Sequence, residues 1–273
     1  MARWKRFIRN PAAVAGTLIC LGLIVVAIFA PAIAPYPPDQ MLLGNRHLPP
    51  SPGHWMGTDF FGRDILSRII IGSRITVAVG LIALLAQAAI GIPLGLAAGY
   101  FKGRIDMVIM RLTDIFMSFP TILLALAIMA VSGGGFWNLI LALSITSWTS
   151  FSRLVRSQVL TLTERDFVQS SHALGARDLR TIFRQILPNC IPIIIVHATL
   201  VVAVPILAES SLSFLGLGLP PETSSWGAMA ATGRAYIREA WWSVTFPGLA
   251  IAVVVLGTNL LGDALRDVLD PKM

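Results

Sequence analysis

Charged residues are scarce in this chain of 273 residues: they make up 13% of the sequence, against 55% for hydrophobic residues, and the mean hydropathy is +0.75. Soluble globular domains contain about 25% charged residues. This composition therefore excludes a soluble domain and indicates an integral membrane protein.

Cysteines and catalytic motifs are also few or missing. Cys20 and Cys190 fall at different expected depths in the membrane, and no CxxC pair occurs, which argues against a disulfide. The chain has no GxxxxGK[ST] phosphate loop, no HExxH and no GxSxG. His47 and His54 are seven residues apart without a neighbouring cysteine, so no metal-binding motif is present. We therefore expect a subunit that is not an enzyme and binds no metal or cofactor.

What the chain does contain is long segments without a charged residue. Each of them exceeds the roughly 20 residues that a helix needs to cross a bilayer; they are Ala12 to Pro38, Ile75 to Phe101, Ile115 to Ser152, Gln185 to Ala208 and Ala240 to Gly262. The run Ser132-Gly133-Gly134-Gly135 interrupts the third segment, which should hold two spans. The predicted fold is all-α, a polytopic membrane protein with six transmembrane helices.

The lysines and arginines predict how the chain is oriented, because cytoplasmic loops carry an excess of them. With both termini in the cytoplasm, the inner side receives 15 of the 21: Arg3, Lys5, Arg6, Arg9, Lys102, Arg104, Arg111, Arg153, Arg156, Arg165, Arg177, Arg180, Arg184, Arg266 and Lys272. The other six are in the two long external segments: Arg46, Arg63, Arg68, Arg74, Arg234 and Arg238. The net charge of +7 therefore reflects topology and contact with anionic lipid, and disfavours nucleic-acid binding.

A polar run from Asp166 to Pro188 separates two apolar segments on the predicted cytoplasmic side. Asp166 followed by Gln169 is a variant capping box, which predicts a short helix. Gly175 tolerates the left-handed conformation that closes a helix, and Asp178 is a candidate cap for the next one. The run therefore predicts two helices that meet at a sharp corner.

The second of these helices is predicted to be amphipathic. Its apolar positions recur at i, i+3, i+4 and i+7 and are Leu179, Ile182, Phe183 and Ile186. Arginines occupy the other face at Arg177, Arg180 and Arg184. Pro188 lacks an N–H, so we expect a break or bend before the next apolar segment.

The segment between the first two spans is rich in proline and glycine. Thr58 or Asp59 is expected to cap a short amphipathic surface helix in which Arg63 and Arg68 share the polar side. We therefore divide the chain into residues 1–73, with the first transmembrane helix and this external segment, and residues 74–273, a five-helix core. The cytoplasmic loop of the core is expected at about residues 160–189.

Polar and small residues inside the predicted spans mark candidate functional positions. Gly91, Gly95 and Gly99 form a GxxxGxxxG row that allows close helix packing. Arg111 and Asp114 are spaced for a mutual ion pair. Polar groups at membrane depth often line transport paths, and the candidates are Gln87, Glu209, Ser210 and Ser211.

The polar run also resembles the EAA loop of binding-protein-dependent ATP-binding cassette (ABC) transporter permeases. Gly175 and Ile186-Leu187-Pro188 match the loop pattern, whereas Gln169-Ser170-Ser171 stands where the family has Glu-Ala-Ala. Two further segments, GTDFFGRDILSR and ESSLSFLGLGLPPETSSWGAM, resemble the peptide and nickel permease branch, specifically its second permease subunit.

This resemblance implies the ABC type I importer permease fold and a location in the cytoplasmic (inner) membrane. It implies a helix that docks on an ATPase subunit, formed by Asp166, Phe167, Gln169, Ser170, Ser171, Ala173, Leu174 and Gly175. The residues that brace this loop would be Asp178, Ile182, Phe183, Ile186, Leu187 and Pro188.

The implied partners are a homologous permease subunit, two cytoplasmic ATP-binding cassette subunits that use ATP and Mg, an extracytoplasmic substrate-binding protein and membrane lipid. The implied function is import of short peptides by alternating access. A nickel importer of the same branch is the nearer alternative, and a secondary transporter that needs no ATPase is the more distant one.

Overall fold

The computed structural model describes residues 10–220 and 222–269, which form a bundle of helices. The α-helices are α2 (Pro11–Ile33), α3 (Ile65–Phe101), α4 (Gly103–Ser118), α5 (Thr121–Ser132), α6 (Phe136–Thr163), α7 (Asp166–Ala173), α8 (Asp178–Thr181), α9 (Leu187–Val201), α10 (Ala203–Phe214), α11 (Trp226–Arg234) and α12 (Trp242–Leu269). A short 3-10 helix, η1 (Leu43–Asn45), lies in the first long loop, and a π-helical turn, η2 (Ile182–Ile186), joins α8 to α9.

Several of these helices are long and apolar enough to cross a membrane. Among the described residues, four single helical segments meet this condition: Pro11–Ile33, Ile65–Phe101, Asp178–Phe214 and Trp242–Val268. A fifth candidate is the pair α4 and α5, which is bent by 86°. The prediction of an all-α fold is thus confirmed for the described residues, which contain four to five candidate spans by length and composition where six were predicted.

The third uncharged segment folds differently from the prediction. A helix does not run unbroken from Ile115 to the glycines at 133–135, because the chain bends between α4 and α5. Phe119 is extended there, with φ −98° and ψ 138°. Pro120 follows it, and a proline disfavours the helical conformation in the residue before it.

Helix α3 also begins earlier than predicted. Its N-cap is Asp64, whose Oδ2 accepts hydrogen bonds from the backbone N–H of Ser67 at 2.8 Å and from its hydroxyl at 2.7 Å. The expected separate helix capped by Thr58 or Asp59 is therefore wrong, since α3 runs unbroken from the external segment into the second span. The proposed boundary at residues 73–74 falls inside this helix.

The external segment is buried where an exposed polar face was expected. Asp59 accepts a hydrogen bond from Nε of Arg63 at 2.7 Å, and both Arg63 and Arg68 are buried. The Arg68 guanidinium donates to the carbonyl oxygens of Pro38 and Thr223. Arg68 is therefore held by contacts with two loops, and Arg63 by a local ion pair with Asp59.

The glycine row of α3 packs against α6, as the sequence predicts for a close helix pair. A Cβ atom placed on Gly91 would lie 2.4 Å from the Trp148 carbonyl oxygen, and one on Gly95 would lie 2.6 Å from that of Ser152. Such distances leave no room for a side chain. The two helices thus form a tightly joined centre of the bundle.

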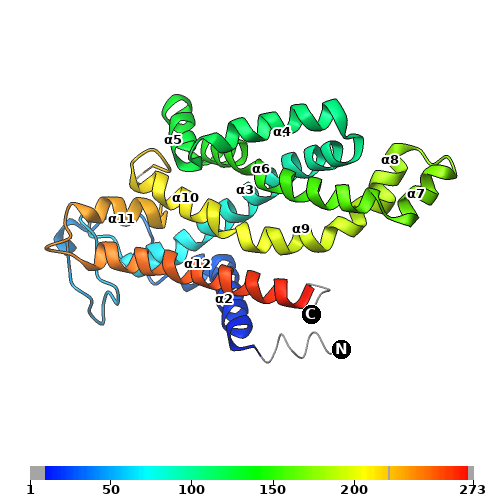
Figure 1. The fold of residues 1–273 in the computed structure, drawn as a ribbon. Coiled ribbons are helices and arrows are strands. Elements are labelled where there is room, and N and C mark those ends of the chain that lie inside the picture. The colour runs from blue at the N-terminus through cyan, green and yellow to red at the C-terminus, as the bar shows by residue number, and fades with distance from the viewer. Residues whose placement is uncertain (1–9, 221, 270–273) are drawn as a thin grey trace.

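The remaining helices connect two ends of an elongated molecule (Figure 1). The corner formed by α7 and α8 lies at one end, and α11 with the loop before α3 lies at the other. Trp242 ties this second end together because its indole N–H donates to the Thr58 carbonyl at 3.1 Å. Helix α2 lies across α12, where Gly16 meets the backbone of Leu261.

Candidate functional site

The short helix α7 occupies the place that the polar run predicts, but its N-terminus is built differently. The N-cap is Arg165, which makes no side-chain capping bond. Asp166 is the first helical residue, and Nε2 of Gln169 donates to the Glu164 carbonyl at 3.3 Å. The predicted capping box is therefore wrong. Asp166 still favours the helix because a negative charge in the first turn opposes the helix dipole.

Gly175 closes α7 in the left-handed conformation that was predicted, with φ +75°. The Gly175 N–H donates to the His172 carbonyl at 2.9 Å, and the Ala176 N–H donates to the Ser171 carbonyl at 3.1 Å. This pair of bonds is a Schellman motif, which satisfies the last carbonyls of the helix. The chain turns sharply here and enters α8.

Asp178 begins α8 but does not cap it, since Arg177 is the N-cap and no side-chain capping bond forms. The Asp178 carboxylate instead accepts a hydrogen bond from the hydroxyl of Tyr100, near the end of α3, at 2.9 Å. A contact with a distant helix thus replaces the local bond that was predicted.

One face of the loop is anchored in the bundle. Val168 of α7 is fully buried, in a cluster with Leu162, Ile182 and Ile186. Nε2 of Gln185 also donates to the Ser171 hydroxyl at 2.7 Å. Helix α7 is therefore held by an apolar contact on one side and a polar contact to the π-helical turn.

The predicted apolar stripe of the second helix is divided between two environments. Ile182 and Ile186 are buried, whereas Leu179 is 67% exposed and Phe183 is 59% exposed. The turn η2 has i→i+5 hydrogen bonds and is wider than an α-helical turn. Residues that a regular helix would align on one stripe therefore face different ways, and Phe183 does not brace the loop.

Pro188 was predicted to cause a break or bend, and the structure has a π-helical turn before it but no break. The helical segment continues from Asp178 to Phe214. A proline ring clashes with the carbonyl four residues earlier in an α-helix, and that position, Arg184, lies in the π-helical turn. The wider turn accommodates the proline without a break.

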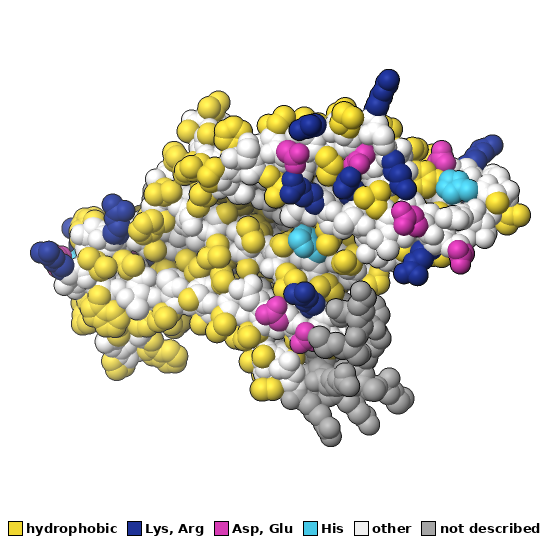
Figure 2. All heavy atoms as spheres, viewed as in Figure 1, with side chains coloured by type: hydrophobic (Ala, Val, Ile, Leu, Met, Phe, Trp, Pro, Cys, Tyr) yellow, Lys and Arg dark blue, Asp and Glu magenta, His cyan; other side chains and the backbone are white. Residues whose placement is uncertain are grey.

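The exposed side of this end combines apolar and charged side chains. Leu174 is 88% exposed, and Leu179 and Phe183 lie uncovered on the neighbouring segment. Figure 2 shows blue and magenta side chains at the end that α7 and α8 form, while yellow side chains cover much of the middle of this face. The basic residues here are Arg165, Arg177, Arg180 and Arg184. Of the charges expected on the same side, Arg3, Lys5, Arg6, Arg9 and Lys272 lie outside the described residues.

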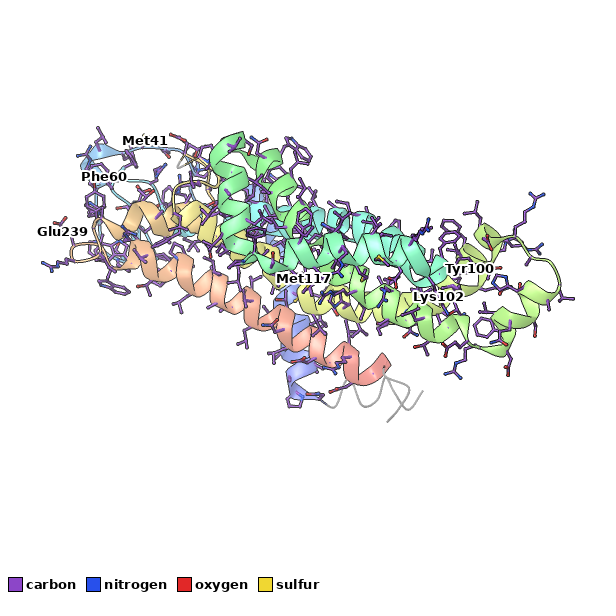
Figure 3. The ribbon with its side chains drawn as sticks, turned by 45° about the horizontal axis from the view of Figure 1, so that its top comes forward. Met41, Phe60, Tyr100, Lys102, Met117 and Glu239 are labelled. Atoms are coloured by element: carbon purple, nitrogen blue, oxygen red, sulfur yellow. The ribbon has the colours of Figure 1, made fainter. Side chains whose placement is uncertain are left out.

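A cavity of about 240 Å³ lies between α3, the α4–α5 corner, α6 and the start of α10. Figure 3 labels Met117, one of its lining residues, about midway between the two ends of the molecule. Its polar lining is uncharged and consists of Gln87, Thr121, Thr146, Ser147, Thr149 and Ser150. Nε2 of Gln87 donates to the Leu143 carbonyl at 3.2 Å. Gln87 was among the predicted path residues, but the hydroxyl groups were missed although the run Thr146-Ser147-Trp148-Thr149-Ser150 is visible in the sequence.

Glu209 is elsewhere and is 1% exposed. Its carboxylate accepts hydrogen bonds from the hydroxyls of Ser225 at 2.6 Å, Ser213 at 2.9 Å and Ser210 at 3.2 Å. These contacts fasten α10 to the start of α11. The half-buried Ser211 bonds to its own helix at the Leu207 carbonyl. Glu209, Ser210 and Ser211 therefore do not line the cavity in this structure.

Ion pairs between α4 and α6 differ from the predicted pairing. Asp114 pairs with Arg153 of α6, and Asp106 pairs with Arg156. The predicted bond between Arg111 and Asp114 is wrong, because α6 offers a cation that faces Asp114 directly. Nδ1 of His54 contacts the Asp64 carboxylate at 2.9 Å. Among the described residues, no three His, Cys, Asp or Glu side chains are grouped to hold a metal ion.

The chain matches two protein-family models. Residues 91–273 match the family described as binding-protein-dependent transport system inner membrane component. Residues 2–50 match the family described as the N-terminal TM domain of oligopeptide transport permease C.

Similar proteins cover almost the whole chain. The dipeptide transport system permease protein DppC of Alkalihalophilus pseudofirmus is 44% identical over 99% of this chain and 89% of its own length. The di/tripeptide transport system permease protein DppC of Pseudomonas aeruginosa is 43% identical over 99% and 91%. The glutathione transport system permease protein GsiD of Escherichia coli O6:K15:H31 is 46% identical over 99% and 89%.

The fold is similar to that of a solved transporter chain. A chain of the MetNI methionine ABC transporter, in an inward-facing conformation, superposes with a TM-score of 0.62. The match covers 75% of this chain and 97% of that one at 18% identity. At this identity the likeness supports the fold alone.

Proposed function

Because this chain belongs to the family of binding-protein-dependent transport system inner membrane components, we propose that it is a permease subunit of an ATP-driven ABC importer for short peptides. The observation that carries this function is the likeness over 99% of the chain to permeases named for dipeptide, di/tripeptide and glutathione transport. This function would assign a role to two parts of the fold, the α7–α8 corner and the uncharged cavity.

The membrane arrangement that we propose has six spans. Five are the candidates described above, and α6 is the sixth. Helix α6 has 28 residues and is therefore about 42 Å long, which exceeds the roughly 30 Å hydrocarbon core of a bilayer. It carries Arg153 and Arg156, which lower its hydropathy, but both pair with carboxylates of α4. Pairing of this kind reduces the cost of charges near a span.

The orientation that we propose puts the α7–α8 corner and both termini in the cytoplasm of the inner membrane. Four arginines lie in or beside this corner, and the positive-inside rule favours the cytoplasm for such a loop. The opposite end, with α11 and the loop before α3, then faces outward, where a substrate-binding protein delivers its cargo.

The corner is a suitable docking surface for a cytoplasmic ATPase subunit. Leu174, Leu179 and Phe183 offer exposed apolar side chains, and the arginines around them give the surface a charged rim. Short helices that insert into grooves bind through such apolar anchors. Two ATPase subunits would use ATP and Mg, and this chain would supply no catalytic group.

The cavity lined by Gln87 and the hydroxyls of α6 is the part of the translocation path that this subunit contributes. A homologous permease would complete the path on the other side. Hydroxyl and amide groups can donate hydrogen bonds to a peptide backbone and accept them from it, whatever side chains the peptide carries. Because the lining has no charge, it forms no ion pair that would hold a charged peptide in the path. ATP binding would shift the two permeases between inward-open and outward-open states. The size of this shift would depend on how much more tightly ATP binds in one state than in the other.

Uptake by the purified transporter in proteoliposomes tests this function. The complex of both permeases and the ATPases, with the external binding protein added, should accumulate a labelled dipeptide when ATP is present. Nickel accumulation without peptide uptake would instead support a nickel importer. Peptide uptake by this chain without ATPase subunits would support a secondary transporter, and either result would contradict the proposal.

A further inference from the structure

Tyr100 connects the α7–α8 corner to the centre of the bundle. It lies one residue before the end of α3, and Figure 3 shows it at the end of the molecule that carries this corner, far from Met41, Phe60 and Glu239. Its hydroxyl donates to Oδ1 of Asp178 at 2.9 Å and lies 3.1 Å from Nε2 of His172. The hydroxyl has one proton, which the carboxylate accepts, so the bond to His172 is donated by an Nε2–H tautomer.

These two bonds cross the bend in the chain. His172 belongs to α7 and Asp178 begins α8, so a single hydroxyl joins the segments on either side of Gly175. The Tyr100 and His172 rings are also stacked, with centroids 5.8 Å apart and an interplanar angle of 25°. The space beside Gly175 is open, since no described residue beyond its chain neighbours lies within 4 Å of a Cβ placed there. The bend is therefore set by the backbone bonds of the Schellman motif and by contacts that α7 and α8 make with other elements.

The helix that carries Tyr100 is held firmly behind this contact. Its neighbour Gly99 packs against α6, because a Cβ there would lie 2.7 Å from the Cβ of Val159. The same helix carries Gln87, which lines the cavity about 20 Å along the axis at 1.5 Å per residue. A displacement of the corner that reaches Tyr100 therefore reaches the same helix that borders the proposed path.

We propose that Tyr100 is a positioning residue for coupling: its hydroxyl holds α7 and α8 at a fixed angle and transmits their displacement by the ATPase to α3. This inference rests on the proposed function. The other anchors of α7 differ in kind, since the Val168 contact is apolar and allows sliding, and the Ser171–Gln185 bond leads to the adjoining π-helical turn. The bonds of Tyr100 are directional and lead to another span.

The test is Tyr100→Phe in the complete transporter, reconstituted in proteoliposomes with its binding protein. His172 and Asp178 are both exposed, so loss of these bonds should leave folding and assembly intact. We expect basal ATP hydrolysis and melting temperature to stay unchanged. The stimulation of ATP hydrolysis by peptide-loaded binding protein, and peptide uptake, should fall about fivefold, within the range by which single residues alter coupling.

A matched control is Thr161→Val, which removes an exposed hydroxyl that donates to the Ser157 carbonyl at 3.3 Å within α6 itself and joins no other element. It should leave stimulation unchanged. Asp178→Ala removes the acceptor and should reduce stimulation as well, and adding it to Tyr100→Phe should cause little further loss, because both changes break the bond between these two residues.

Wild-type stimulation and uptake in Tyr100→Phe would overturn the inference, as would an equal loss in Thr161→Val. A loss that follows a fall in melting temperature, with additive effects of Tyr100→Phe and Asp178→Ala, would also overturn it. In each case the wild-type complex would still import peptide. Failure of the wild-type complex to do so would contradict the proposed function itself.

Discussion

At the residue scale, the α7–α8 corner depends on one backbone conformation. Gly175 has a φ of +75° and open space around it, so a substitution there is resisted by backbone strain and not by collision. A left-handed conformation costs a residue other than glycine about 1–2 kcal/mol, less for asparagine and more for a β-branched side chain. The angle between the docking helix and α8 is therefore sensitive to the identity of this residue.

We expect Gly175→Val to uncouple the transporter without preventing its insertion. The strain, more than about 1–2 kcal/mol, should shift α7 from its docking position and abolish most peptide-stimulated ATP hydrolysis in the reconstituted complex. Gly175→Asn is the control, since asparagine tolerates this conformation, and it should retain stimulation. Equal activity of the two variants would refute the role of the positive φ.

The sequence predicted Gly175 correctly but not the polar contacts around it. A glycine between two helical patterns is typical of a helix end, whereas Gln169 bonds to the Glu164 carbonyl and not to the N-cap, and Asp178 has a distant partner. Asp178 bonds to Tyr100, 78 residues away in the sequence. Glu209 likewise bonds to Ser225 across a loop. Rules for helix caps consider only residues near the end of the helix, so they cannot predict partners that lie far away in the sequence.

At the element scale, the α3–α6 pair is the joint on which the bundle depends. Three glycines, one in each turn of α3, allow its backbone to lie against that of α6, and the charged pairs to α4 hold α6 from another side. The sequence predicts this contact because glycines at GxxxG spacing lie on one face of a helix and let another helix approach closely. Pro120 favours a bend between α4 and α5, but the sequence does not distinguish it from Pro93, Pro192 and Pro247, which lie inside helices that continue.

Gly95→Ala should destabilise the subunit by about 1–3 kcal/mol, the usual cost of overpacking. The added Cβ would lie 2.6 Å from the Ser152 carbonyl oxygen and 2.8 Å from the Val155 side chain. Thermal unfolding of the purified complex in detergent measures the effect. Gly22→Ala is the control, since Gly22 lies in α2 with no atom within 4 Å of the added Cβ. A melting temperature lowered equally by both changes would rule out close packing as the cause.

At the scale of the whole molecule, the fold separates three tasks along one axis. One end carries an apolar and arginine-rich corner, the middle holds an uncharged cavity, and the other end is built from loops tied by buried tryptophans and arginines. Uncharged segments predicted the apolar helices, and the orientation drawn from the basic residues stays a prediction. The segment before α3 was mispredicted because Arg68 bonds to the carbonyls of Pro38 and Thr223, which lie far away in the chain and which periodicity cannot reveal.

The central claim is that the α7–α8 corner contacts a cytoplasmic ATPase subunit, and site-directed crosslinking tests it most directly. Leu174→Cys, 88% exposed at the corner, would carry a thiol-reactive photo-crosslinker in a chain whose Cys20 and Cys190 are replaced by alanine. Met41→Cys, exposed at the opposite end, is the matched control. In the intact transporter we predict a crosslink to the ATPase subunit from position 174 and none from position 41. No crosslink from position 174, or equal crosslinks from both positions, would contradict the account.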